Sequence, residues 1–283
     1  MDKLIFLDSF EIHALNRAAR VCYRAGGKGI NVSREARRLG AKTVAMGFLS
    51  GQTGKKISRM LLEKGVPCDF IEVAGETRTN SKIIDMSSGK CTEINENSPE
   101  LAPSDLRKME EKLRNVIKPG DIVIFSGSAP VNTPSDIYRR WILLAKEMGA
   151  VTILDADGDL LLSGIKAHPA VVKPNLKELS VLLGEPCEEV TDDVVSRVQT
   201  MISDDMRMIF LTMGAKGEVL IEKNRVLACE APDVTVVSTV GAGDAMVAAI
   251  AVGLQNGYSS EEILKMTVES AGRAISDAEE MAP

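Results

Sequence analysis

The most informative stretch of this 283-residue sequence is Ser238-Thr239-Val240-Gly241-Ala242-Gly243-Asp244-Ala245-Met246. Its small residues predict a tight turn that opens an amphipathic helix near residues 242–256. Glycines let a backbone approach a ligand closely, and the free N–H groups at a helix start suit an anion. Asp244 falls in the first helical turn, where it either stabilises the helix dipole or takes a proton from a bound hydroxyl group.

Outward from this turn, strand-like segments alternate with helix-like ones. The strand-like runs are apolar and rich in β-formers, at residues 43–49, 121–126, 151–155, 170–173 and 208–212. The helix-like segments lie between them, at residues 30–39, 55–64, 104–117, 135–148, 176–183 and 192–202. The last third adds a hairpin, residues 218–222 with 225–229, and helices at 242–256 and 260–276. This order predicts an α/β domain with a mainly parallel sheet.

Two segments, residues 4–22 and 68–95, interrupt the alternation because they are rich in strand formers and lack an amphipathic helix. Residues 83–85 and 91–94 resemble hairpin strands around Ser87-Ser88-Gly89-Lys90. We expect the two segments to form a small sheet that stands off the main domain as a lid. The alternative is a pair of long surface connections.

Composition excludes several functional classes. No run of about 18 uncharged apolar residues predicts a transmembrane helix, and the N-terminus lacks the pattern of a signal peptide. Five scattered cysteines favour reduced thiols in a cytoplasmic protein. Two distant histidines argue against a histidine-based metal site or a Ser/His/Asp triad, and the net charge of −6 argues against nucleic-acid binding.

Two further motifs carry cations and amides suited to a phosphorylated ligand. In Gly26-Gly27-Lys28-Gly29-Ile30-Asn31-Val32, glycines lead into a helix that carries Lys28 and Asn31, although a plain connection has the same pattern. In Thr77-Arg78-Thr79-Asn80-Ser81-Lys82, strand alternation puts Arg78, Asn80 and Lys82 on one face. That face could clamp a phosphate or simply be solvated.

The run Lys173-Pro174-Asn175-Leu176-Lys177-Glu178 follows a buried strand and begins a helix. Asn175 and Glu178 have the spacing of an N-cap pair, and they could also order water around Mg²⁺. Two smaller signals end other strands: Ser126-Gly127-Ser128-Ala129-Pro130, and Thr212-Met213-Gly214-Ala215-Lys216-Gly217, which could line a nucleotide pocket.

Complete nucleotide-binding fingerprints of other folds are absent from the sequence. Met246 stands where the third glycine of a dinucleotide-binding G-x-G-x-x-G would be, and residues 51–56 have the wrong glycine spacing for a P-loop.

The chain resembles the PfkB-type carbohydrate kinases over essentially its whole length, because it carries the motifs GGKGINV, KPNLKEL and STVGAGDAMVA in this order. The resemblance implies a ribokinase-like fold: a three-layer α/β/α core with a mainly parallel sheet, a small β-sheet lid, and a single domain over residues 1–283. TRTNSKI followed by GKCTEINENSPEL is most similar to the 1-phosphofructokinase branch, with tagatose-6-phosphate kinases and minor 6-phosphofructokinases as neighbours.

The resemblance also implies a role for each motif. Asp244 would be the catalytic base, beside an anion hole formed by the amides of Gly241, Ala242 and Gly243. Asn175 and Glu178 would order Mg²⁺ through water. ATP would be bordered by Lys173, Thr212, Gly214, Gly217 and Ser238. The sugar phosphate would be held by Asp2, Gly27, Lys28, Asn31, Arg78 and Ser128.

The implied activity is ATP-dependent phosphorylation of D-fructose 1-phosphate to fructose 1,6-bisphosphate, in a homodimer formed through the lid sheets. Tagatose-6-phosphate or fructose-6-phosphate kinase is the alternative enzyme, and a truncated sugar-phosphate sensor is the non-enzyme alternative.

Both ends depart from the family pattern. Asp2 matches a sugar-binding Asp that a core strand normally precedes, so we expect coding sequence upstream; without that strand, backbone groups would be unpaired beside an apolar gap. A closing helix is likewise missing after Gly272, which puts part of the adenine pocket and the activity of the product in question.

Overall fold

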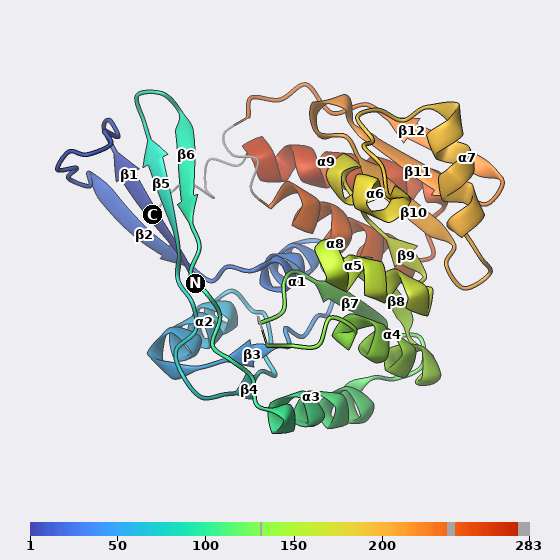
Figure 1. Cartoon of the computed structure of the whole chain (residues 1–283), viewed down its shortest axis with the longest axis horizontal. Helices are drawn as coiled ribbons and strands as arrows, with labels where there is room; N and C mark the ends of the chain where they lie inside the picture. The colour runs from blue at the N-terminus through green and yellow to red at the C-terminus, as the bar shows by residue number, and fades with distance from the viewer. Residues whose placement is uncertain (131, 237–240, 277–283) are drawn as a thin grey trace.

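The computed structural model describes residues 1–130, 132–236 and 241–276. They form a main body on a six-stranded sheet, with a separate four-stranded sheet standing beside it (Figure 1).

The main sheet has the order β12-β11-β10-β9-β8-β7. Four of its strands are parallel: β7 (Ile122–Ser126), β8 (Val151–Asp155), β9 (Val171–Val172) and β10 (Met208–Thr212). The hairpin β11 (Glu218–Glu222) and β12 (Arg225–Cys229) joins β10 antiparallel. The predicted mainly parallel sheet is therefore confirmed.

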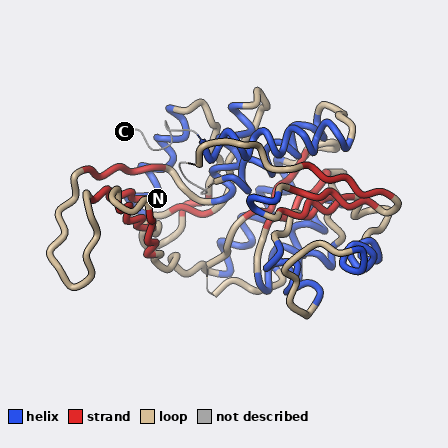
Figure 2. Tube along the Cα trace, turned by 90° about the horizontal axis from the view of Figure 1, so that it is seen from above, coloured by secondary structure: helices blue, strands red, loops and turns tan. Residues whose placement is uncertain are grey.

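Helices cover both faces of this sheet (Figure 2). One face carries α3 (Pro103–Val116), α4 (Ile137–Glu147), α5 (Gly158–Gly164), α6 (Leu176–Leu183) and α7 (Asp192–Met201). The other carries α1 (Lys28–Arg38), α8 (Ala242–Gln255) and α9 (Ser260–Ser276). The sequence pattern anticipated each of these helices except the seven-residue α5.

Alternating side chains of the strands feed these two layers. Ile209 and Leu211 of β10 pack with the α3–α7 layer, whereas Phe210 between them packs with the α1, α8 and α9 layer. All three are almost completely buried, as expected for a strand covered on both faces. The result is the predicted three-layer α/β/α core.

The smaller sheet has the order β2-β1-β5-β6, formed by β1 (Asp2–Leu7), β2 (Arg20–Arg24), β5 (Asn80–Asp85) and β6 (Lys90–Ile94). It brings together the two segments that interrupted the alternation, and we call it the lid sheet. Not all of residues 68–95 enters it: β4 (Ile71–Glu72) pairs with β3 (Phe48–Leu49) next to α2 (Gly51–Glu63). The expected strand at 43–49 is thus reduced to β3 and an isolated bridge from Ala45 to Cys68.

No helix within the described ranges is long and apolar enough to cross a membrane.

Candidate active site

Chemically active side chains gather where the parallel strands end, at the start of α8. Ser126 ends β7, Asp155 ends β8, and Lys173 directly follows β9. Because parallel strands end at the same edge of a sheet, their last residues and the loops that follow them lie close together at that edge.

Asp244 lies in the first turn of α8, behind the glycine turn. Gly241 caps the helix with a φ of 87°, a left-handed conformation that glycine adopts without strain. The Asp244 carboxylate is only 6% exposed and accepts a hydrogen bond of 2.8 Å from the Asn31 side-chain amide on α1. Two motifs 213 residues apart in the chain therefore meet at one carboxylate.

Burial raises the pKa of Asp244 to about 6. The hydrogen bond from Asn31 opposes this rise, nearby Asp155 adds to it, and Lys28 and Lys173 oppose it. A carboxylate with such a pKa is ionised at neutral pH and is still basic enough to accept a proton from a polarised hydroxyl.

Asp155 is the hub of the charges around this site. It is 1% exposed, and its carboxylate lies 3.3 Å from Lys28 Nζ and 3.1 Å from Lys173 Nζ. The Ser126 hydroxyl donates a third contact of 3.1 Å. Burial opposes the ionisation of Asp155, but Lys173 and Lys28 outweigh it and hold the pKa of Asp155 below its ordinary value.

Asp155 belongs to none of the sequence motifs described above, although Lys28 and Lys173 both contact it. The available signal was an acid at the last position of a continuously apolar strand, where ligands of open α/β sheets bind.

Lys173 lies beside the glycine turn. A Cβ placed on Gly243 would come within 3.4 Å of Lys173 Nζ, so glycine at this position leaves the ammonium room. Lys173 is 5% exposed, and its pKa is raised because Asp155 more than offsets the effect of burial. The cation thus adds positive charge next to the first turn of α8. Ser238, also expected at the nucleotide, lies outside the described residues.

Asn175 and Glu178 form a reciprocal capping box at the start of α6. The Asn175 side chain accepts from the Glu178 N–H at 3.0 Å, and Glu178 Oε2 accepts from the Asn175 N–H at 2.9 Å. Burial raises the pKa of Glu178, against the effects of its cap bond and of Lys173. Asn175 and Glu178 therefore form the N-cap pair that their spacing predicts. The cap uses Glu178 Oε2 and does not involve Glu178 Oε1.

Asn175 and Glu178 could bind Mg²⁺ only through water molecules. No group of three or more His, Cys, Asp or Glu side chains in the described part of the chain could hold a metal directly. Glu178 Oε1 is a hard oxygen of the kind that binds magnesium through water. The donor set suits an ion that arrives with nucleotide phosphates and keeps several waters.

The remaining nucleotide candidates lie at the same edge. The Thr212 N–H donates to the Pro174 carbonyl at 3.0 Å, which ties the end of β10 to the loop before α6. Gly214 then begins a short 3₁₀ turn. Gly217 has a φ of 91° and packs against the Cys229 carbonyl so closely that no side chain would fit.

The sugar-phosphate candidates link the lid sheet to the main body. The Arg78 guanidinium donates to the Ser128 hydroxyl at 3.0 Å. The Asp2 carboxylate lies against Gly26, next to Gly27, and is 3.5 Å from Lys82 Nζ. Since β5 begins at Asn80, Arg78 precedes the strand, and the expectation of Arg78, Asn80 and Lys82 on one strand face is wrong for Arg78.

Comparison with known proteins finds relatives that match nearly the whole chain. The family model described as pfkB family carbohydrate kinase matches residues 2–282. The tagatose-6-phosphate kinase of Staphylococcus epidermidis is 34% identical over 263 residues, which cover 92% of this chain and 84% of that protein. The 1-phosphofructokinase of Bacillus subtilis is 31% identical over 281 residues, which cover 99% of this chain and 91% of that protein.

A similar solved structure is phosphofructokinase-2 from Escherichia coli in complex with fructose-6-phosphate. It has a TM-score of 0.91 and 27% sequence identity, and the match covers 97% of this chain and 90% of that chain.

Proposed function

The chain belongs to the pfkB family of carbohydrate kinases, and from this premise we propose that it phosphorylates D-fructose 1-phosphate to fructose 1,6-bisphosphate. Family membership makes it a phosphotransferase that uses ATP and a hydroxyl acceptor, with a fold of the ribokinase-like class. The proposal adds the identity of the sugar phosphate. It is supported by the run TRTNSKI with GKCTEINENSPEL and by the match to a 1-phosphofructokinase over 99% of the chain.

The observation that carries the mechanism is the buried Asp244 carboxylate held by Asn31 at 2.8 Å behind a glycine turn. In the proposed reaction, the 6-hydroxyl of the sugar gives its proton to Asp244 as its oxygen bonds to the γ-phosphorus of ATP. The bond from that phosphorus to the β,γ-bridging oxygen breaks, and ADP leaves with the electron pair. The amides of Gly241, Ala242 and Gly243 stabilise the charge on the transferred group.

Cations and polar groups on either side of Asp244 would bind the two substrates. The sugar phosphate is assigned to Asp2, Gly27, Lys28, Asn31, Arg78 and Ser128. ATP is assigned to Lys173, Thr212, Gly214, Gly217 and Ser238. Asn175 and Glu178 would hold the waters of Mg²⁺, which when bound neutralises charge on the nucleotide phosphates.

A coupled assay of ADP release across three sugar phosphates tests the proposal. We expect kcat/KM for fructose 1-phosphate to exceed that for fructose 6-phosphate and tagatose 6-phosphate by at least about tenfold, equivalent to ~1.4 kcal/mol. Asp244→Asn serves as the control for contaminating kinases.

Tagatose 6-phosphate is the second candidate substrate, because a tagatose-6-phosphate kinase is 34% identical to this chain. A higher kcat/KM for that sugar would replace the first proposal. Thermal stabilisation by a sugar phosphate without ADP release would instead indicate a sensor.

We further propose that residues 1–283 form one kinase domain and that two subunits pair through their lid sheets. Register puts Ile5, Val21, Ile83 and Ile94 on one face of the lid sheet, and Val21 and Ile94 are 44% and 56% exposed. Asp2 and Lys82 lie on the opposite face, so pairing through the apolar face would leave them free for substrate.

A further inference from the structure

Helix α2 begins with the run Gly51-Gln52-Thr53-Gly54, whose spacing does not match a phosphate-binding P-loop. Its first turn nevertheless binds an anion, the carboxylate of Glu76. The Gln52 N–H donates to Glu76 Oε2 at 3.1 Å, and the Thr53 N–H donates to Glu76 Oε1 at 2.5 Å. Each carboxylate oxygen thus satisfies one of the N–H groups that a helix start leaves without an intrahelical partner.

This cap comes from outside the helix. Ser50 at the N-cap makes no side-chain cap bond, and the first turn of α2, all of it described, contains no acid. Gly51 has a φ of 64°, and a Cβ at this position would collide with the Glu76 carboxylate. Hydrogen bonds from Thr53 and from the Gln52 N–H hold the pKa of Glu76 below its ordinary value of 4.5, so the cap is ionised at neutral pH.

Thr77, the next residue, is tied to the same helix start. Its N–H donates to the Ser50 carbonyl at 3.1 Å. Its hydroxyl accepts from the Ser50 N–H at 2.8 Å and donates to the Ser50 carbonyl at 3.0 Å. A Cβ on Gly54 would come within 3.2 Å of Thr77 Oγ1. Gly51 and Gly54 therefore make room for Glu76 and Thr77.

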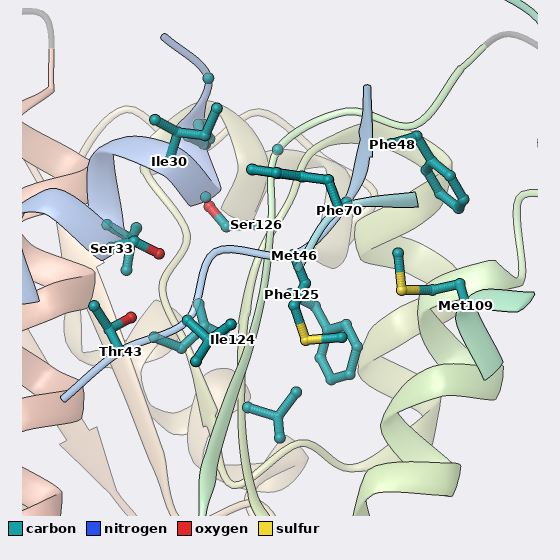
Figure 3. Close-up of a pocket in the computed structure, with 18 of the residues that line it drawn as sticks. Ile30, Ser33, Thr43, Met46, Phe48, Phe70, Met109, Ile124, Phe125 and Ser126 are labelled. Carbon is teal, nitrogen blue, oxygen red and sulfur yellow. The ribbon is translucent and has the colours of Figure 1, made fainter. Parts of the chain in front are cut away.

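The start of α2 is in turn fixed to the main body through β3. The Leu49 carbonyl accepts from the Val73 N–H at 2.9 Å, which joins the end of β3 to the β4 segment. The Phe48 ring lies 6.4 Å from the ring of Trp141 on α4. Figure 3 shows Phe48 and Phe70 among the side chains that line a pocket next to β7. Glu76 and Thr77 therefore bind to a platform that packs against the main body.

Arg78 follows these two anchors directly and precedes Asn80, the first residue of β5. The ladder of the lid sheet, as the described strands form it, therefore does not fix the backbone of Arg78. One residue later, the Thr79 N–H donates to Glu96 Oε2 at 2.7 Å. Side-chain bonds thus hold the chain on both sides of Arg78, whose guanidinium reaches the Ser128 hydroxyl at 3.0 Å.

We propose that Glu76 is a positioning residue, which sets the place of the Arg78 guanidinium by binding the first turn of α2. The inference rests on the proposed function, which assigns Arg78 to the sugar phosphate. Two parallel N–H···O bonds between an arginine and a phosphate demand a narrow geometry, so a small displacement of the backbone weakens binding. The nucleotide candidates lie elsewhere, after β9 and β10, so loss of Glu76 acts on the sugar phosphate and spares ATP.

Steady-state kinetics of Glu76→Ala test the proposal, with whichever sugar phosphate gives the highest kcat/KM in the ADP-release assay. We expect KM for that sugar phosphate to rise at least about tenfold, while KM for ATP stays within about twofold of the unmodified value. Gly51→Ala displaces the same carboxylate by another route and should raise the same KM. The double variant should be no worse than the worse single variant, because both changes remove one interaction.

Glu262→Ala is the matched control. Glu262 is also an exposed acid at a helix start, where it accepts from the Ser259 N–H at 2.7 Å and has a lowered pKa. Its loss should lower Tm about as much as Glu76→Ala does and leave both KM values unchanged. Amide hydrogen exchange at Gln52 and Thr53 reports on the cap itself and should quicken only in Glu76→Ala.

Faster exchange at Gln52 and Thr53 with an unchanged KM for the sugar phosphate would overturn the proposal, because the cap would then be only structural. Unchanged exchange, or an equal rise in KM for ATP, would overturn it too. Arg78→Ala separates these failures from failure of the proposed function. If Arg78→Ala raises KM and Glu76→Ala does not, the positioning role alone is wrong. If neither raises KM, the assignment of Arg78 to the sugar phosphate is wrong and the positioning role falls with it.

Discussion

The charge state of the single residue Asp244 is set by opposing interactions. Burial and the Asp155 carboxylate favour its neutral form, whereas the Asn31 amide and two lysines favour the carboxylate. A general base must be ionised, but burial of Asp244 disfavours its ionised form. The buried carboxylate therefore lowers the stability of the folded chain at neutral pH.

Asp244→Asn should therefore have opposite effects on activity and on stability. We expect kcat to fall by roughly 10²–10⁴-fold, the usual contribution of a general base. The folded pKa of Asp244, about 6, lies above its ordinary value of 3.8, so its stabilising contribution is complete below about 3.8 and is lost as pH rises through about 6. Above that pH the variant should melt a few degrees higher, measured by calorimetry.

Asp193→Asn is the matched control, because Asp193 is also an acid in the first turn of a helix. It should change neither kcat nor the acid limb of the pH profile. In the unmodified chain, kcat/KM should fall about tenfold per pH unit below about 6, where Asp244 becomes protonated. A profile flat down to pH 5 would contradict the assignment of Asp244 as the base.

Asp155→Asn should be strongly destabilising, because it leaves the buried Lys173 ammonium without its counter-charge. Breaking a buried pair in this way typically costs about 3–5 kcal/mol of unfolding free energy. The double variant Asp155→Asn/Lys173→Met should recover part of that loss in urea denaturation. A double variant as unstable as the sum of the two single variants would show that the pair is not coupled.

At the scale of elements, α6 and α7 offer a matched pair of caps. Asn175 caps α6 with Glu178 completing the box, and Thr191 caps α7 by accepting from the Val194 N–H at 3.3 Å. Only the α6 cap lies beside the charged cluster of the site, within the influence of Lys173 and Asp155.

Glu178→Gln keeps an oxygen for the cap but removes the charge. We expect a small change in Tm and at least a tenfold rise in the Mg²⁺ concentration that gives half-maximal activity. Thr191→Ala should cost about 1 kcal/mol of stability and leave the Mg²⁺ dependence unchanged. Equal Mg²⁺ dependence in both variants would mean that Glu178 only caps its helix.

Glu218 connects β11 to α9 through the Thr267 hydroxyl. Burial raises its pKa to about 7, and the Thr267 hydrogen bond and Lys173 only partly oppose this. Its stabilising contribution is therefore complete below about 4.5, the ordinary value, and is lost as pH rises through about 7. Stability should fall by about 1.4 kcal/mol per pH unit across that window from this residue alone.

Glu218→Gln should remove that slope, which urea denaturation at several pH values would measure. At pH 8 the variant should be more stable than the unmodified chain. An unchanged slope would show that Glu218 is already ionised in the folded state at pH 5.

At the scale of the whole molecule, the proposed function assigns one face of the lid sheet to substrate and the other to a second subunit. Ile94→Lys places a charge on the apolar face, whereas the side chains of Asp2 and Lys82 lie on the opposite face. We expect light scattering to show a dimer for the unmodified chain and a monomer for the variant, since a buried unpaired charge opposes association. A monomeric unmodified chain would contradict the proposed pairing.

Local patterns account for much of the fold. The strands at 151–155 and 208–212, the hairpin and the helices at 176–183 and 260–276 have their predicted bounds because hydrophobic period and turn residues act over short distances. Helix α5 has no clear helical pattern in the sequence because it has only seven residues and a glycine at each end. The strand at 43–49 is shorter than its apolar pattern suggests because, within the described ranges, it pairs only at Ala45 with Cys68 and at Phe48–Leu49 with β4.

Local sequence is enough to predict the alternation of strands and helices, the glycine turn before Asp244, and the Asn175–Glu178 cap, whose partners are three residues apart. Folding sets the pKa of Asp244, brings Lys28 to Asp155 across 127 residues, and joins Asn31 to Asp244 across 213 residues. The physical reason is that burial and charge proximity arise from segments brought together by folding. A residue's neighbours in the chain fix its local geometry, but not what shields it from water.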